Sequence, residues 1–395
     1  MKHKINVYLL LLIPFFASNT VTAETFIEAF KNGSIEANLR YRYESVDQNN
    51  ALENAKASTI RTRLGYRTGD YNGFTFYAEL DDVRKIGFDN YTTPNGGPLA
   101  TSVGPKFTEH SIIADPLATK LNQLTISYKN ENSKLTIGRQ RIIRGNSRFI
   151  GNVGWRQHEQ TYDGVSFSNE SIDNLSLFAA YIENRNTITF TEIEQDTFLL
   201  DAKYTGFKEA DLTMYYYDIN VGNSPAKWEN IGVRYSAKYK KLSYTLEYAQ
   251  QSTATAAKPD YLFLEGSYKL DIASLSIGYE SLGSDNNVGF TTPLATLHKF
   301  NGWADQFLAT PNVGLVDKYI KASRKLESVN VAAIFHQYDS DINDVDLGDE
   351  LNLVITKKVS DTYSIGAKYA DYSAGDVWVA KVDAEKFWFW GEAKF

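Results

Sequence analysis

One pattern runs through almost the whole chain: apolar and polar residues alternate one by one in short segments. Near the start, Ile35, Leu39 and Tyr43 alternate with charged residues such as Arg40. Successive side chains of a β-strand point to opposite faces, so each segment predicts a strand with one apolar and one polar face. Eighteen such segments follow one another up to Phe395, and the fold has to be built from them.

The connections between these segments alternate in length. Short connections have six residues or fewer, and long ones interleave with them, the longest being residues 84–120 and 283–315. Proline is excluded from central strands, and every proline after residue 23 falls in a long connection. These prolines are Pro94, Pro98, Pro105, Pro116, Pro225, Pro259, Pro293 and Pro311. Short turns at one rim and long loops at the other predict an all-β, 18-stranded antiparallel transmembrane β-barrel with periplasmic turns and extracellular loops.

The first residues predict export. Lys2 and Lys4 precede an apolar stretch at residues 7–17, and small residues then lead to Ala23. This is the layout of a secretory signal, so we expect a signal peptide at residues 1–23, cleaved after Ala23, and a barrel domain at 24–395. The alternative is a single-pass anchor, but a helical span needs about 20 apolar residues. The expected location is the outer membrane of a Gram-negative bacterium.

A soluble β-sandwich or propeller is the main alternative fold. In that case the apolar rows would face a core instead of lipid. Tyrosines near the strand ends resemble the aromatic girdles of membrane barrels, no linker divides the chain, and Phe395 ends an alternating aromatic segment. These features favour a barrel whose apolar rows contact outer-membrane lipid and lipopolysaccharide.

The polar rows would then face the lumen, and a barrel of this width leaves a water channel. Arginines are concentrated in the polar rows of the first two strands, and one more lies on the tenth. These candidate pore-lining residues are Arg40, Arg42, Arg61, Arg63, Arg67 and Arg234. Rings of guanidinium groups favour anions, because the planar fork of arginine matches a carboxylate. Alternatively, the arginines pair with inward carboxylates such as Asp81, Asp201 and Glu247.

Two connections carry further candidates. The segment 138–164 contains Arg139, Arg141 and Arg144, where we expect the strand to end and the arginines to rise into a vestibule for anions, unless they lie on an ordinary solvated loop. The segment 289–315 is apolar for a loop, and its aromatic residues recur at helical spacing. It predicts a short amphipathic element that either folds inward to narrow the pore or forms a local core.

These two segments, GRQR…VGWRQ…TYDG and TPLATLHKFNGWADQFLATP, resemble the alginate-export family of outer-membrane proteins. The resemblance extends over essentially the whole chain after residue 23. It implies an 18-stranded monomeric barrel with an arginine-lined pore for an anionic polysaccharide made of uronates. It also implies that Arg144 and Asp163 line the pore.

The sequence therefore predicts a channel that passes anionic solutes by passive diffusion, such as acidic oligosaccharides or alginate-like uronates. A general diffusion porin without sugar specificity is the alternative, and a barrel-embedded hydrolase or an adhesin is a more distant one. The chain has no Gly-x-Ser-x-Gly elbow and no basic groove with a stacking platform for nucleic acid. We expect no enzymatic activity, no cofactor, no metal, no nucleic-acid partner and a monomer.

Overall fold

The computed structural model describes residues 25–94, 109–222, 224–375 and 381–395, so the predicted signal peptide and its cleavage site lie outside the described residues. The main elements are α1 (Phe26–Lys31), β1 (Ser34–Gln48), β2 (Ala55–Arg67), β3 (Phe74–Asn90), β4 (Thr119–Lys129), β5 (Ser133–Gln140), β6 (Thr161–Ile172), β7 (Leu175–Asn186), β8 (Glu192–Phe207), β9 (Ala210–Asn220), β10 (Lys227–Tyr239), β11 (Leu242–Thr253), β12 (Asp260–Lys269), β13 (Ser274–Leu282), β16 (Leu315–Leu326), β17 (Val329–Asp339), β18 (Asp346–Lys358), β19 (Tyr363–Ser373) and β20 (Ala384–Lys394).

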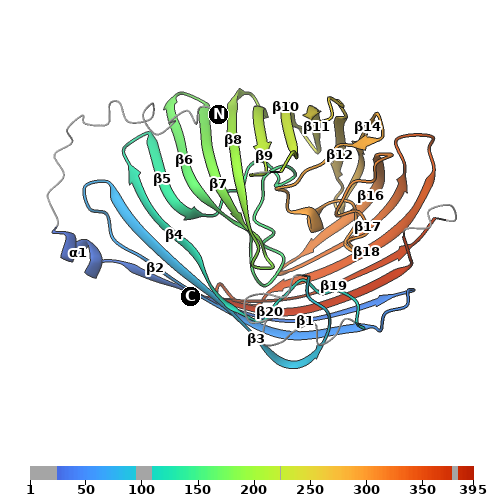
Figure 1. Cartoon of the computed structure of the whole chain (residues 1–395), viewed down its shortest axis with the longest axis horizontal. Helices are drawn as coiled ribbons and strands as arrows, with labels where there is room; N and C mark the ends of the chain where they lie inside the picture. The colour runs from blue at the N-terminus through green and yellow to red at the C-terminus, as the bar shows by residue number, and fades with distance from the viewer. Residues whose placement is uncertain (1–24, 95–108, 223, 376–380) are drawn as a thin grey trace.

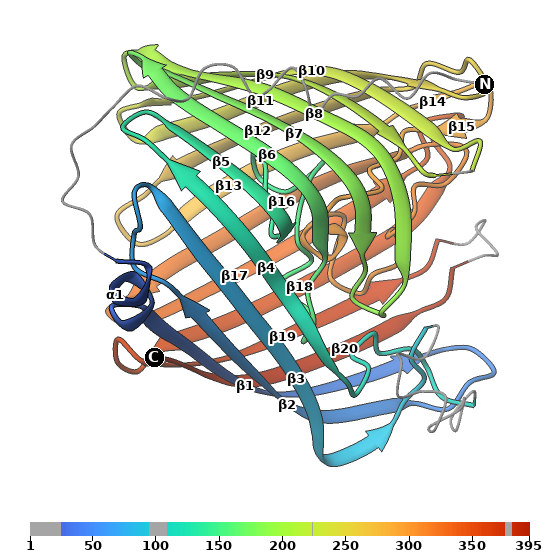
Figure 2. The ribbon, with the colours of Figure 1, turned by 60° about the vertical axis from the view of Figure 1, so that its left-hand side comes forward.

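Eighteen of the strands form one closed antiparallel sheet (Figures 1 and 2). Each strand pairs with its neighbours in sequence, and β1 pairs with β20 to close the ring. The closure extends to the last residue, because Ala37 and Phe395 exchange two backbone hydrogen bonds of 3.1 and 2.8 Å. The predicted 18-stranded barrel is confirmed. A closed sheet leaves no free strand edge, which suits a chain that has no cysteine for disulfides.

The alternation of the sequence becomes an outer and an inner row on each strand. On β4 and β5, Leu124, Ile126 and Ile137 are about half exposed, whereas Thr125 and Thr136 between them are buried. Apolar side chains that remain exposed over a whole face belong against lipid. Among the described residues, no helix is long and apolar enough to cross a bilayer.

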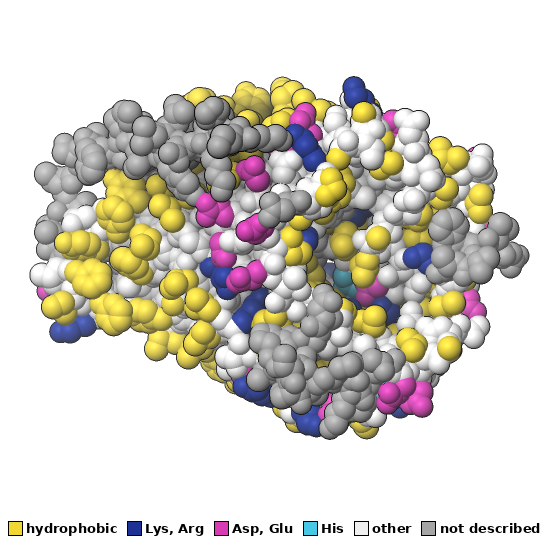
Figure 3. All heavy atoms as spheres, in the orientation of Figure 1, with side chains coloured by type: hydrophobic (Ala, Val, Ile, Leu, Met, Phe, Trp, Pro, Cys, Tyr) yellow, Lys and Arg dark blue, Asp and Glu magenta, His cyan; other side chains and the backbone are white. Residues whose placement is uncertain are grey.

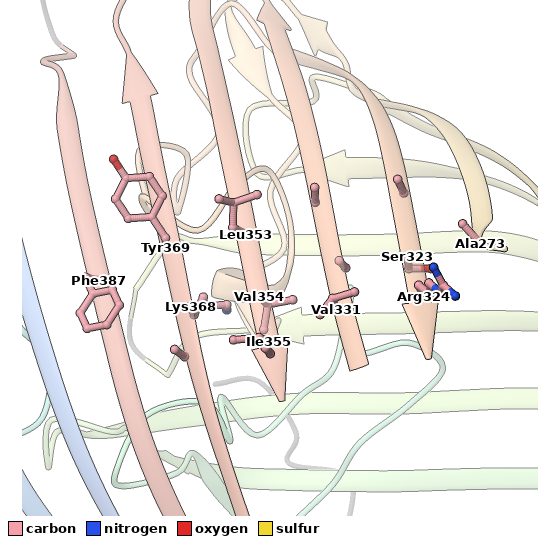
Figure 4. Close-up of a pocket in the computed structure, with 14 residues that line it drawn as sticks. Ala273, Ser323, Arg324, Val331, Leu353, Val354, Ile355, Lys368, Tyr369 and Phe387 are labelled. Atoms are coloured by element: carbon pink, nitrogen blue, oxygen red, sulfur yellow. The ribbon is translucent and has the colours of Figure 1, made fainter. Parts of the chain in front are cut away.

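Small side chains leave a hollow in the outer row over β16 to β20 (Figure 4). It measures about 480 Å³, and its lining includes Ala322, Ala333, Leu353, Tyr369 and Phe387. Each of these residues lies in the apolar row of its strand. The hollow therefore belongs to the lipid-facing surface.

The structure differs from the sequence-based expectations in three local elements. Helix α1 was not predicted, although Thr25 and Glu28 form a capping box whose spacing is visible in the sequence. A two-stranded hairpin, β14 (Ser284–Asp285) and β15 (Val288–Gly289), precedes the long apolar loop. That loop contains only a single 3₁₀ turn, η2 (Leu297–Lys299), so the helical element predicted from its aromatic spacing was wrong.

Candidate functional site

Three long connections fold back into the barrel: residues 109–118 after β3, 141–160 after β5 and 290–314 after β15 (Figures 1 and 2). The last two touch each other, because Gly151 N donates to Leu294 O at 2.8 Å and Thr296 N donates to Ser147 O at 3.0 Å. In the space-filling view, basic, acidic and histidine side chains gather around a central hollow (Figure 3). These inward loops form the candidate functional site, the constriction of the lumen.

Three of the predicted arginines hold the 141–160 loop against the wall. Arg40 Nε donates to Gln157 Oε1 at 2.9 Å, and Arg61 Nη1 donates to the backbone oxygen of Gln157 at 3.2 Å. Arg42 donates to the backbone oxygen of Trp155 and pairs with Asp115 at 3.4 Å. All three guanidinium groups are buried. The loop covers them, so their role in this structure is to anchor it, whereas the alternation of the sequence had placed them facing water.

Arg63 and Arg141 meet at one buried carboxylate. Arg141 Nε donates to Glu159 Oε2 at 2.7 Å, and Arg63 Nη1 lies 3.3 Å from Glu159 Oε1. Arg63 Nη2 also donates to Asp81 Oδ2 at 2.7 Å. Burial alone would raise the pKa of Glu159, but the hydrogen bond from Arg141 and the two positive charges lower it to about 2. Glu159 is therefore ionised and ties the loop to β2.

Arg144 and Arg234 face a second part of the lumen, over β7 to β12. Arg144 Nε donates to Asp201 Oδ2 at 2.7 Å, and its guanidinium carbon lies 3.9 Å from the ring centre of Phe178. Arg234 pairs with Glu247, and its guanidinium carbon lies 5.6 Å from the ring centre of Phe263. Both guanidinium groups thus lie within cation–π distance of an aromatic ring, and both side chains remain partly exposed.

Two predicted residues lie elsewhere. Arg139 is the next-to-last residue of β5, in register with Asp163 on β6, so the strand does not end before it as predicted. Arg139 shares the outer row of Ile137, and its Nε donates to Asp163 Oδ1 at 2.7 Å. Arg139 and Asp163 therefore lie on the outer face of the barrel and do not line the lumen as expected. Arg67 lies near the periplasmic rim, 3.5 Å from Glu36 and half exposed.

In the pair of Arg61 and Glu392 the carboxylate side chain is the more exposed, but in four other lumen pairs the exposed fraction is larger for the arginine side chain than for the acid. It is 14 % and 0 % for Arg63 and Asp81, 32 % and 2 % for Arg141 and Glu159, 27 % and 3 % for Arg144 and Asp201, and 20 % and 4 % for Arg234 and Glu247. The negative charges are covered by protein and the positive charges meet the water. In these four pairs, the cation is therefore the more exposed member.

The 290–314 loop is fixed by a buried charged cluster. Asp305 Oδ1 accepts from His298 Nδ1 at 2.6 Å, and Lys368 on β19 faces His298 Nε2 at 3.0 Å. Since Nε2 faces an ammonium group, it accepts, and Nδ1 carries the proton. Burial lowers the pKa of His298 to about 3, against the opposing charge of Asp305. The imidazole is therefore neutral, and it stacks on Trp155 with ring centres 5.1 Å apart.

Sequence reasoning missed the residues that assemble this cluster. Lys368 is buried against Trp155 and Trp303, with its Nζ 4.1 and 3.8 Å from their ring centres. Asp305 and Glu159 are the carboxylates that hold the two loops. The signal available was weak: Asp305 stands in a segment that is apolar for a loop, whereas Glu159 lies between His158 and Gln160 in an arginine-rich segment. In the described parts of the chain, no group of three or more acidic or histidine side chains is placed to hold a metal ion.

A closed 18-stranded barrel with an apolar outer face and extracellular loops folded into its lumen defines an outer-membrane channel of the porin type. The chain belongs to the alginate-export family, whose model matches residues 32–263. The predicted family and the outer-membrane location are thus confirmed. No curated protein matches the sequence.

Solved structures with the same fold are outer-membrane porins of low sequence identity. OccAB4 of Acinetobacter baumannii has a TM-score of 0.70 at 12 % identity, over 92 % of this chain and 98 % of that one. OccK9 (OpdG) of Pseudomonas aeruginosa has a TM-score of 0.71 at 12 % identity, over 93 % and 100 %. OpdK of Pseudomonas aeruginosa, solved with vanillate, has a TM-score of 0.70 at 10 % identity, over 93 % and 99 %.

Proposed function

We propose that this barrel passes anionic solutes by passive diffusion, and that acidic oligosaccharides or uronate polymers are its preferred class. The observation that carries the proposal is the orientation of the lumen pairs. Four guanidinium groups face water while their carboxylates are buried behind them, in the pairs of Arg63, Arg141, Arg144 and Arg234. A passing anion therefore meets cations first.

The chemistry of arginine supports this reading. A guanidinium group has five N–H donors, and a forked bond to one carboxylate uses two of them. Arg144 bonds Asp201 through Nε and Nη2, so its Nη1 edge is left to face the lumen. A carboxylate of a passing sugar can accept from such an edge without displacing the resident acid. Vanillate, present in the OpdK structure, is likewise a carboxylate.

The proposal is tested by reversal potentials in planar bilayers under a salt gradient. We expect the wild-type channel to prefer chloride over potassium. The variant R141Q/R144Q/R234Q should lose this preference, because it removes three of the exposed positive charges from the lumen.

The matched control R84Q/R139Q/R324Q removes the same number of arginines from the outer rows of β3, β5 and β16. It should leave selectivity unchanged. A second variant, R144Q/D201N, removes a whole pair and shows whether folding is intact when no buried charge is left unpaired. An unselective wild-type channel would instead establish a general diffusion porin.

A further inference from the structure

The hollow on the outer face of β16 to β20 rises from the periplasmic rim toward the middle of the barrel wall. Figure 4 shows Arg324 and Ala273 at one end of the hollow and Phe387 at the other. Arg324 stands two residues before the end of β16, whereas Phe387 stands seven residues before the end of β20, and both strands end at the periplasmic rim. The hollow therefore begins near the membrane surface and leads into the apolar band of the barrel.

The size of the hollow suits one acyl chain. Ala322 on β16 stands opposite Ala333 on β17, and Ala367 on β19 stands opposite Ile355 on β18, so small side chains form much of its floor. It crosses five strands, and four spacings of about 4.8 Å make it roughly 19 Å long. One leaflet supplies about 15 Å of hydrocarbon, half of a core of about 30 Å. The volume of about 480 Å³ lies within the range of ligand sites.

Two cations face outward at the periplasmic end of the hollow. Arg324 on β16 and Lys357 on β18 both lie in the exposed row of their strands. Within the residues that the structure describes, neither forms an ion pair, whereas Arg84 and Arg139, also in outer rows, pair with acids at 2.7 Å. Other strands have exposed aromatic residues at this level of the outer face, such as Tyr204, Tyr239 and Tyr268. The positive charge beside the hollow is therefore available to a ligand on the membrane side.

We propose that the hollow is a binding site for an anionic glycerophospholipid of the periplasmic leaflet. One acyl chain lies in the hollow, and the phosphate lies between Arg324 and Lys357. The planar fork of a guanidinium group matches phosphate oxygens, and an ammonium group adds a point charge. The two cations are two strands apart, about 10 Å, so their long side chains can share one headgroup. The proposal concerns the outer face and does not depend on the ion selectivity of the lumen.

Two other occupants fit the hollow less well. Lipopolysaccharide forms the extracellular leaflet, whereas Arg324 and Lys357 lie at the periplasmic end of their strands. A second copy of the chain, related by a two-fold axis along the membrane normal, would present the same patch. The four cations of the two copies would then meet at one depth, and their mutual repulsion is strong in a medium of low dielectric constant.

The test is native mass spectrometry of the barrel released from detergent micelles. The protein is titrated with dioleoyl-phosphatidylglycerol or, as a probe without net charge, dioleoyl-phosphatidylcholine. We expect one phosphatidylglycerol to be retained at concentrations at which phosphatidylcholine is lost. The same spectra show whether the barrel forms a dimer, and heat-modifiable migration in gels shows that each variant is folded.

The variant R324Q/K357Q tests the headgroup contact. It should raise the dissociation constant for phosphatidylglycerol by about 10- to 30-fold, because each cation near an anionic lipid surface contributes about a factor of five. The control K208Q/K240Q removes the same charge from two exposed turns at the same rim. It should bind phosphatidylglycerol as the wild type does.

The variant A333F tests the acyl-chain contact, because it fills the hollow without changing any charge. It should also weaken retention of phosphatidylglycerol. The control A179F puts the same side chain into the outer row of β7, opposite Leu200 and away from the hollow. It should leave retention unchanged.

Equal retention of the two lipids overturns the inference, and so does binding that either R324Q/K357Q or A333F leaves unchanged. A dimer that retains no phosphatidylglycerol and is lost in A333F would assign the hollow to a second copy and would also overturn it. Reversal potentials are not used in this test, so its outcome is distinguishable from that of the test of the proposed function.

Discussion

Replacing Asp305 by asparagine should loosen the inward loops without unfolding the barrel. Asp305 accepts from three groups on three elements: His298 at 2.6 Å, Lys386 on β20 at 2.9 Å and Arg156 of the 141–160 loop at 3.3 Å. Asparagine has nearly the same size, so the change creates no cavity. It removes the charge that holds both cations.

The magnitude follows from which partners remain. Breaking a buried ion pair by removing one member costs about 3 to 5 kcal/mol. Arg156 keeps Glu44 at 2.9 Å, but Lys386 has no other carboxylate within 4 Å in the described chain. The lower end, about 3 kcal/mol, is therefore expected, and it corresponds to a change of about 150-fold in the loop equilibrium. The strand ladders do not involve Asp305, so the cost falls on loop closure.

Single-channel recording checks this directly. D305N should show frequent transitions to a higher conductance, and the 290–314 loop should become sensitive to added protease. D361N is the control, because Asp361 pairs with Lys358 in an exposed turn. D305N/K386Q should show fewer such transitions than D305N, because it removes the unpaired ammonium group. Wild-type conductance and protease resistance in D305N would refute the view that this cluster holds the loop.

Three further outcomes follow from the same structure. The pKa values of His298 and Glu159, about 3 and about 2, lie below those of the unfolded chain, so the unfolded loops bind more protons and the inward loops lose stability as pH falls from about 6.5 toward 3. Current noise of the open channel should therefore rise at pH 4.5, and it should rise less in H298Q. Current noise that does not change with pH would contradict this role of the two residues. Gly138 has φ +114° and no room for a Cβ, so G138A should lower barrel stability by about 1 to 3 kcal/mol in urea unfolding, whereas G266A, at an open position, should cost less. L353R puts a charge in the lipid-facing row and should cost about 2 to 4 kcal/mol in folding into vesicles, and no measurable loss would place that row away from lipid.

The barrel could be predicted from sequence because its signal is local. Period-two alternation assigns each side chain to a face without knowledge of any other strand, and alternating loop lengths give the two rims. The prediction was wrong at Arg139, where we expected the strand to end, whereas Arg139 pairs with Asp163 within the sheet. In the structure, β5 continues through Gly138, which has φ +114°, in unbroken register with β4 and β6.

The loops could not be predicted, because their positions depend on contacts between residues far apart in sequence. Arg40 and Gln157 are separated by 117 positions, and Arg148 and Asn301 by 153. Aromatic spacing in the 290–314 loop predicted a helix, yet Phe307 packs on Tyr338 with ring centres 4.7 Å apart. Burial against the wall explains these aromatic residues without any helical periodicity.

The alternation of polar and apolar residues does not determine the ion selectivity of the channel. Parity places Arg234 and Glu247 on the same inner face and therefore permits either charge to dominate. Which charge a solute meets depends on how deeply each side chain is buried in the barrel wall, and this burial depends on the neighbouring side chains that cover it. Tyr215 donates to Glu247 at 3.0 Å and buries it, while Arg234 extends beyond both toward water. The proposed preference for anions is thus compatible with an acidic chain, because net charge counts all residues whereas a solute responds to the exposed ones.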